Sequence, residues 1–245
     1  MMTEKEKTVK KTNNSNIEDL FSVGAHYAYS RSRRHPSASS FIFGVKNKVE
    51  IFDLEKTEER IKEAESFIYD LAQKRGTILF VGGKNEARKP IKEHALRIGQ
   101  PYVAGRWLGG TITNFSQMSK RIQRLDELEE QKKKGLLDKY TKKERLLMDR
   151  EIEELKENFE GIRNMKETPN ALFIVDLKKE SIALKEAKHK NIPVLTVSNS
   201  NCDLTEADIS IPCNDSVQKS IDYVVTRIAD AYKKGLDQTP SLKEE

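Results

Sequence analysis

The fold is decided by residues 171–177, ALFIVDL, in which five consecutive apolar residues precede an acid. Two further apolar runs resemble it, TILFVGG at 77–83 and IPVLTVSNS at 192–200. Short apolar runs that end in glycine or polar residues are typical of strands buried on both faces of a parallel sheet. We therefore expect a parallel sheet at the centre of the molecule.

Helical patterns alternate with these runs. Residues 54–72 place Ile61, Ala64, Ile68 and Leu71 on one helical face. The same reasoning predicts helices at about 85–98, 179–189 and 216–233, and short strands in VEIF (49–52), PYVAG (101–105) and ISIP (209–212). We interpret 49–52, 54–72 and 77–83 as the first strand, helix and strand of this pattern. The alternation predicts an α/β fold with a doubly wound, mostly parallel sheet of flavodoxin-like or Rossmann-like type.

Residues 108–166 contain no strand pattern and separate the two halves of the α/β pattern. Their apolar residues recur three and four positions apart on two helices, at Phe115, Met118, Ile122 and Leu125 and again at Met148, Ile152, Leu155, Phe159 and Ile162. Such a spacing predicts an inserted antiparallel coiled-coil hairpin whose many lysines and glutamates form a solvated face. The predicted α/β domain then comprises 17–107 plus 167–235.

Composition limits the classes of protein to consider. The 245 residues are 36% hydrophobic and 34% charged, and the ends at 1–16 and 236–245 have the composition of disordered or flexible tails. We expect a cytoplasmic protein without membrane contact, because no apolar run approaches the roughly 18 residues of a membrane helix and residues 1–16 contain no apolar segment that could act as a secretory signal. Cys202 and Cys213 form no CxxC pair and are expected to be inert.

Positive charge gathers in two stretches that contain no Asp or Glu. Residues 20–49 contribute five cations, and residues 94–125 contribute five more, each number equal to the net charge of +5 of the whole chain. Both stretches also contain hydroxyl, amide and aromatic side chains, which can contact phosphate, ribose and bases. Each stretch alone could be an ordinary solvated face. Two of them in one chain favour a polyanionic partner.

A catalytic site is not apparent. The segment FVGGKNEAR at 80–88 offers a glycine turn, Gly82–Gly83, which could cradle a phosphate, but it matches neither of the two common phosphate-binding motifs. The loop SNSNCD at 198–203 follows a strand, where α/β proteins often bind ligands, yet it offers no nucleophile and base. The four histidines lack metal-ligand spacing. We keep a nucleotide-binding enzyme that uses the Gly82–Gly83 turn as the alternative, and otherwise predict no catalytic residue, cofactor or metal.

The longer segments resemble a known family. VGAHYAYSRSRRHPSASSFIFGVKNKVEIFDLEKT (23–57) and HALRIGQPYVAGRWLGGTITNF (94–115) are similar to the two signatures of the bacterial ribosomal small-subunit protein S-two family. The similarity continues through FVGGKNEAR, GIRNMKETPNALFIVDLKKESIALKEA, NIPVLTVSNSNCD and IPCNDSVQKSI, in unbroken order. It spans roughly residues 17–234.

The resemblance implies a doubly wound α/β domain with an inserted coiled-coil hairpin. It further implies a structural, non-enzymatic constituent of the small ribosomal subunit that binds ribosomal RNA, contacts other small-subunit proteins and helps to dock the mRNA-binding protein S-one. We predict RNA contacts from the cations and amide of the two acid-free stretches, and a buried anchoring role for the single tryptophan, Trp107. The predicted RNA-binding residues are Arg31, Arg33, Arg34, Lys46, Lys48, Arg106, Asn114, Lys120 and Arg121.

The chain departs from the family's pattern at several positions within or near these stretches. The departures are Ala28, Tyr29, His35, Ala104, Gly105, Asn199 and Cys213. A divalent ion held by His26 with Asp203 or Asp215 is the one metal arrangement the pattern suggests. We expect no metal there, since the family's pattern is short of one carboxylate and one histidine in this chain.

Overall fold

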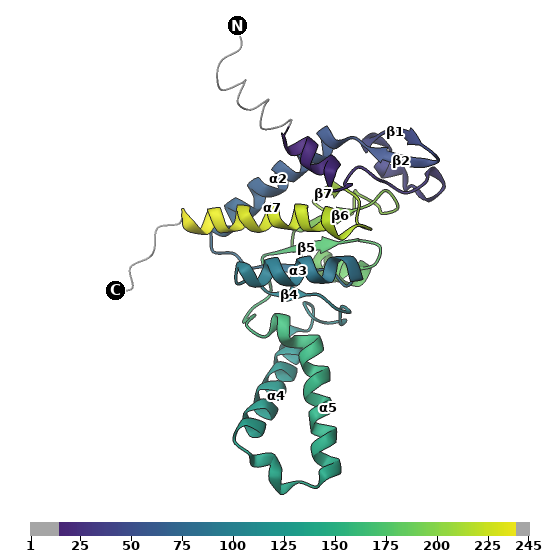
Figure 1. The fold of residues 1–245 in the computed structure, drawn as a ribbon. Coiled ribbons are helices and arrows are strands. Elements are labelled where there is room, and N and C mark those ends of the chain that lie inside the picture. The colour runs from purple at the N-terminus through teal and green to yellow at the C-terminus, as the bar shows by residue number, and fades with distance from the viewer. Residues whose placement is uncertain (1–14, 239–245) are drawn as a thin grey trace.

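The computed structural model describes residues 15–238, and these form an α/β body from which a long helical hairpin projects (Figure 1). The predicted tails fall mostly outside the described residues. Residues 15 and 16 differ from the prediction, because they belong to a helix over 15–22. At the other end the last helix continues to residue 237.

The body is built on five parallel strands. They lie in the order β4-β3-β5-β6-β7, so the direction in which strands are added reverses between β3 and β5. Open α/β sheets bind ligands outside the carboxyl ends of their strands at such a reversal. The strands are β3 (Ile78–Val81), β4 (Tyr102–Val103), β5 (Ala171–Val175), β6 (Val194–Ser198) and β7 (Ile209–Pro212).

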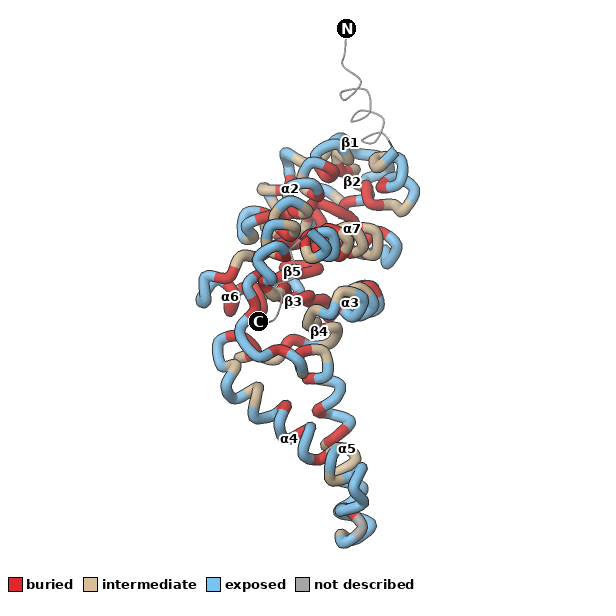
Figure 2. Tube along the Cα trace, turned by 90° about the vertical axis from the view of Figure 1, so that its left-hand side faces the viewer, coloured by how far each residue is buried: buried red, intermediate tan, exposed pale blue. Residues whose placement is uncertain are grey.

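Helices cover both faces of this sheet, as the alternation of strands and helices predicts. Alternate strand residues point to opposite faces. Phe80 and Phe173 pack with the apolar sides of α2 (Leu54–Gln73), α3 (Asn85–Arg97) and α7 (Gln218–Asp237). Leu79 and Ile174 pack on the other face with α6 (Ser181–His189) and the region around Trp107. Figure 2 shows the buried residues concentrated between these layers.

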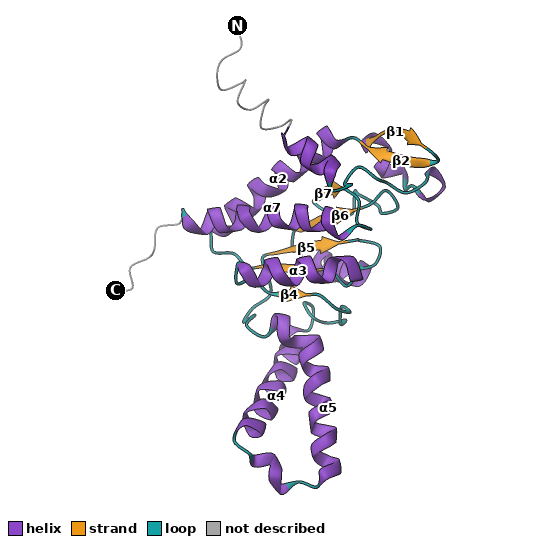
Figure 3. Ribbon diagram, viewed as in Figure 1, coloured by secondary structure: helices purple, strands orange, loops and turns teal. Residues whose placement is uncertain are grey.

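The strand at 49–52 does not belong to the parallel sheet, which corrects our interpretation of 49–83. It is β2 (Val49–Phe52) and pairs antiparallel with β1 (Ile42–Lys46) in a separate two-stranded sheet (Figure 3). The cause is the turn between them. Asn47 and Lys48 both have positive φ, 52° and 65°, the geometry that folds a chain back on itself in a two-residue hairpin.

The insertion consists of α4 (Phe115–Lys133) and α5 (Lys142–Phe159), and the segment that joins them contains the 3-10 turn Leu136–Lys139. A second 3-10 turn, Glu160–Ile162, follows α5. Ile122 and Leu125 of α4 and Ile152 and Leu155 of α5 are buried between the helices. Toward the tip Leu146 and Leu147 are about half exposed, and the two antiparallel helices diverge (Figure 1). Coiled-coil packing along the whole hairpin therefore stays a prediction. No helix within residues 15–238 has the length and apolar character to cross a membrane.

Candidate functional site

The first acid-free stretch, residues 20–49, is fastened to one end of the sheet's carboxyl edge. It includes the 3-10 turns Arg31–Arg33 and Pro36–Phe41 and strand β1. The loop after β6 holds it, because the backbone N–H groups of Tyr29 and His35 donate to the hydroxyl and carbonyl of Ser200 at 3.1 and 2.7 Å. The loop after β7 adds the bond from Asn214 N–H to the carbonyl of Ala25 at 3.0 Å.

The second acid-free stretch, residues 94–125, reaches the opposite end of the same edge. After β4 the chain passes so close to the loop after β3 that a Cβ on Gly83 would lie 2.5 Å from the carbonyl oxygen of Gly105. Trp107 follows and is buried, with 5% of its surface exposed, while Arg106 beside it is exposed. The two stretches thus share one edge of the sheet but form separate surfaces, since β3 and β5 lie between the attachment at β4 and the attachments at β6 and β7.

Glu186 of α6 holds the loop that carries Trp107. Its Oε1 accepts from the Trp107 indole at 3.0 Å and from the Gly110 N–H at 2.7 Å. Its Oε2 accepts from the N–H groups of Ile112 and Thr113 and from the Thr113 hydroxyl, at 3.0 to 3.1 Å. Burial alone would raise the pKa of Glu186, but these donors together hold that pKa below its usual value.

The sequence analysis did not single out Glu186. The sequence does contain a signal for it. Glu186 lies on the same face of α6 as the buried residues Ala183 and Ala187, three positions after the first and one before the second. An acid on an apolar helical face requires donors from elsewhere in the chain. In this protein the donors come from a loop more than 70 residues away in sequence.

Most of the predicted RNA-binding cations are exposed and have no acidic partner within the described chain. The exception is Arg34, whose Nη1 donates to the buried carboxylate of Glu50 at 2.9 Å. Arg97 and Arg124, which also lie in the second stretch, pair with Asp230 and Glu151. The cations without such a partner are Arg31, Arg33, Lys46, Lys48, Arg106, Lys120 and Arg121. Asn114 is exposed at the first turn of α4, and its side chain makes no capping hydrogen bond.

Aromatic rings accompany the cations of the first stretch. The imidazole of His26 lies between Phe21 and Tyr27, with ring centroids 4.4 and 4.1 Å away. Burial and the positive charge of Lys46 lower the pKa of His26, so its ring is neutral at physiological pH. Arg33 lies over the ring of Tyr29, 5.8 Å from its centroid. Neutral rings beside exposed cations suit a partner that has both flat bases and phosphates.

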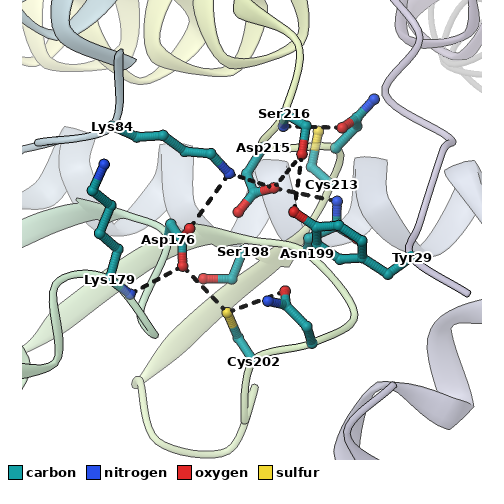
Figure 4. Close-up of polar contacts among 12 residues, drawn as sticks. Tyr29, Lys84, Asp176, Lys179, Ser198, Asn199, Cys202, Cys213, Asp215 and Ser216 are labelled. Atoms are coloured by element: carbon teal, nitrogen blue, oxygen red, sulfur yellow. Dashed lines mark hydrogen bonds and ion pairs between the residues drawn. The ribbon is translucent and has the colours of Figure 1, made fainter. Parts of the chain in front are cut away.

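A buried ionic cluster occupies the carboxyl edge between the two stretches (Figure 4). The ammonium of Lys84 lies 3.4 Å from Asp176 and 3.1 Å from Asp215, and so connects the ends of β3, β5 and β7. Burial would lower the pKa of Lys84, but the two carboxylates raise it and keep the group charged. Asn199 donates to Asp215 at 3.3 Å. Burial raises the pKa of Cys202 and of Cys213 to about 12, so both thiols are unreactive.

Comparisons with known proteins assign the chain to a family. The family model described as "Ribosomal protein S2" matches residues 20–235. A curated protein of Roseiflexus sp. (strain RS-1), named small ribosomal subunit protein uS2, is 43% identical over 224 residues, which cover 91% of this chain and 86% of that protein. The chain belongs to the ribosomal protein S2 family. It is therefore a structural protein of the small ribosomal subunit and not an enzyme.

Membership in the S2 family rules out the alternative interpretation, a nucleotide-binding enzyme. The structure shows what the Gly82–Gly83 turn does instead. The N–H of Gly83 donates to the carboxylate of Glu180 at 3.1 Å, so the donor that a phosphate would need is already occupied. The Lys84 ammonium beside the turn is likewise engaged, because it lies 3.4 Å from Asp176 and 3.1 Å from Asp215. The two glycines allow the loops after β3 and β4 to approach each other.

The departures from the S2 pattern fall on structural contacts rather than in one pocket. The backbone N–H groups of Ala28 and Tyr29 donate to Glu50 and Ser200, which any residue except proline could do. The suggested metal ligands also have separate partners, because Asp215 binds Lys84 while Asp203 binds Thr205 and lies 3.6 Å from His35. Within residues 15–238 no group of three such ligands is placed to hold a metal ion.

Proposed function

We propose that this S2-family chain binds small-subunit ribosomal RNA mainly through phosphate contacts from its two acid-free stretches. The observation that carries the proposal is the set of seven exposed cations in the two acid-free stretches, none of which has an acidic partner within residues 15–238. Paired arginines such as Arg97 already have a counter-charge, whereas unpaired ones can exchange mobile counterions for phosphates. The proposed contact residues are the same as in the sequence analysis, except that Arg34 serves the fold through Glu50.

The test compares equal losses of charge at unpaired and paired arginines. The double variant Arg31→Gln/Arg33→Gln should bind a transcript of small-subunit ribosomal RNA more weakly. The slope of log affinity against log salt should fall by about two, because each lost phosphate contact removes about one released counterion.

The matched control is Arg97→Gln/Arg124→Gln. It removes the same charge from exposed ion pairs, so its salt slope should stay close to that of the unmodified protein. Equal slopes for the two double variants would show that the first stretch does not touch phosphate and would contradict the proposal.

We propose in addition that the assembled chain helps to dock the mRNA-binding protein S-one, as the family resemblance implies. Small subunits reconstituted with and without this chain should differ in the amount of S-one that they retain. Equal retention by the two kinds of subunit would contradict this role.

A further inference from the structure

The β1–β2 hairpin presents an uncovered edge. Strand β1 pairs with β2 along one side only, and no other segment of residues 15–238 pairs with its outer side. Phe43 is 80% exposed and Val45 is 61% exposed, the highest values among large apolar side chains of this sheet. An exposed edge strand with apolar side chains promotes aggregation unless a partner covers it, and exposed apolar patches usually mark binding sites.

Gly44 lies between Phe43 and Val45 and leaves open space beside the strand. A Cβ at this position would meet no atom within 4 Å, and its φ lies outside the left-handed region that favours glycine. The pairing with β2 is irregular between Ile42 and Gly44, which sets Phe43 apart from the regular ladder. Within strands, glycine often marks such an irregularity, and it also marks places where a ligand approaches the backbone closely.

The charges around this edge favour an anionic occupant. Lys46 and Lys48 are exposed and lack acidic partners among the described residues, and residues 20–49 contain no acid. Glu50, which pairs with Val45 across the hairpin, is buried and bound to Arg34. An acidic protein segment could also pair with the edge. An RNA nucleotide uses more of what is present, because its base can stack on Phe43 while its phosphates meet the two lysines.

We propose that Phe43, Gly44 and Val45, with Lys46 and Lys48, form a platform for an unpaired nucleotide of ribosomal RNA. The phenyl ring of Phe43 stacks on the base, and the open space at Gly44 lets the nucleotide approach the strand. The lysines bind the flanking phosphates. This inference rests on the proposed RNA-binding function and adds to it a contact that carries no charge.

The absence of charge at Phe43 makes the test specific. Phe43→Ala in the full chain should weaken binding to a small-subunit ribosomal RNA transcript about tenfold, the usual range for one lost base-stacking contact. Its salt slope should equal that of the unmodified protein, because no counterion exchange is lost. Lys46→Gln/Lys48→Gln should instead lower the slope by about two.

Two further variants separate binding from folding. Gly44→Val fills open space and introduces a strand-forming residue, so thermal unfolding of the free protein should stay unchanged or rise slightly while RNA affinity falls. Leu147→Ala is the control, since it truncates a similarly exposed apolar side chain, 54% exposed, on the hairpin tip. Its RNA affinity should be unchanged.

The outcomes distinguish this proposal from the broader one. Unchanged RNA affinity of both Phe43→Ala and Gly44→Val would overturn the platform. If the unmodified protein still showed a salt-dependent RNA affinity, the proposed phosphate contacts of the arginines would remain supported. Protection of residues 42–46 from hydrogen exchange in the assembled subunit, combined with unchanged RNA affinity of Phe43→Ala, would assign the edge to a protein and also overturn it. If the unmodified chain shows no salt-dependent RNA binding, the proposed function itself fails.

Discussion

Glu186 shows how a single buried carboxylate can organise a functional segment. It accepts hydrogen bonds from one side chain indole, one hydroxyl and three backbone N–H groups of residues 107–113. A buried charge is tolerable only when hydrogen bonds of this kind replace its hydration. The loop geometry that exposes Arg106 and buries Trp107 therefore depends on a residue that touches no RNA in our proposal.

We predict that Glu186→Gln lowers the free energy of unfolding by about 1 to 3 kcal/mol at pH 7, because an amide cannot accept from all five donors. The pKa of Glu186 is lowered in the folded protein, so its ionised form stabilises the fold above the usual glutamate pKa. That contribution is lost as pH falls through the lowered pKa. Urea unfolding followed by circular dichroism at pH 7 and below pH 4 should show the difference shrinking.

The control for this prediction is Glu157→Gln, which changes an exposed glutamate of α5. Its stability should match that of the unmodified protein at both pH values. A difference between Glu186→Gln and the unmodified protein that does not change with pH would contradict the assigned role of the ionised carboxylate.

Trp107 and Arg106 are neighbours with opposite expected roles. Trp107→Ala should cost roughly 3 to 5 kcal/mol of stability, because it empties a buried site and leaves Glu186 without one donor. Arg106→Ala should leave thermal unfolding nearly unchanged and reduce RNA affinity. Iodide quenching of the single indole gives an independent measurement, and fluorescence accessible to iodide in the free protein would contradict the buried placement.

At the scale of elements, the hairpin and the β1–β2 sheet are attached to the body in different ways. The base of the hairpin shares a core with α6 and the sheet through residues such as Ile162 and Ile112. Farther out, α4 and α5 depend on their own apolar contacts and on ion pairs such as Lys132 with Asp149. Exposed ion pairs contribute little, about 1 kcal/mol or less, so the buried leucines and isoleucines decide whether the outer hairpin folds.

We predict that Leu155→Asp unfolds α4 and α5 while the parallel sheet stays formed. Leu155 is 7% exposed between the two helices, and burying an unpaired carboxylate there costs on the order of 3 kcal/mol or more. Circular dichroism should show a loss of helix, and hydrogen exchange should assign it to residues 115–159. Leu147→Asp is the matched control on the same helix, and an equal loss of helix in both variants would contradict the assigned seam.

At the scale of the whole molecule, the carboxyl edge of the sheet connects the parts. The acid-free stretches attach at its two ends, and the cluster of Lys84 with Asp176 and Asp215 lies between them. This cluster is the place where the topology of an α/β sheet would ordinarily put a ligand. In this chain a lysine supplies the positive charge, and the edge serves as a scaffold for the two acid-free stretches.

We predict that Lys84→Met destabilises the fold by about 3 to 5 kcal/mol at pH 7, because two buried carboxylates lose their counter-charge. Burial already raises the pKa of Asp215 against the influence of Lys84. Without the lysine that pKa rises further, and a raised carboxyl pKa gives stability that is lost as pH increases. The variant should therefore recover stability between pH 7 and pH 5 in urea unfolding.

Lys84→Arg is the matched control because it keeps a positive charge at the same position. It should be less destabilised at pH 7 and should lack the recovery at pH 5. A Lys84→Met variant whose stability relative to the unmodified protein is the same at both pH values would contradict the charge-balancing role of Lys84.

Elements whose burial repeats with a local period could be predicted from the residues alone. Five strands and four long helices of the α/β body follow from runs such as ALFIVDL and from helical spacing, because each element must bury one face or both. The helical insertion was predictable from the same periodic burial. The two acid-free stretches were predictable because the residue types alone reveal them. The strand Ile42–Lys46 was missed because its exposed Phe43 and Val45 give no sign of burial.

How these elements combine, and which charges within residues 15–238 have no partner, depends on contacts that form only in the folded chain. The strand at 49–52 joined a hairpin because a two-residue turn at Asn47 and Lys48 folds the chain back before the parallel sheet begins. Arg97 forms an ion pair with Asp230, more than 100 residues away in sequence, whereas Arg106 forms no ion pair within the described chain. A local sequence pattern indicates whether a residue prefers water or the protein interior. An ion pair, or a buried carboxylate with its hydrogen-bond donors, needs partners from distant segments, and only the folded topology brings these within a few ångströms.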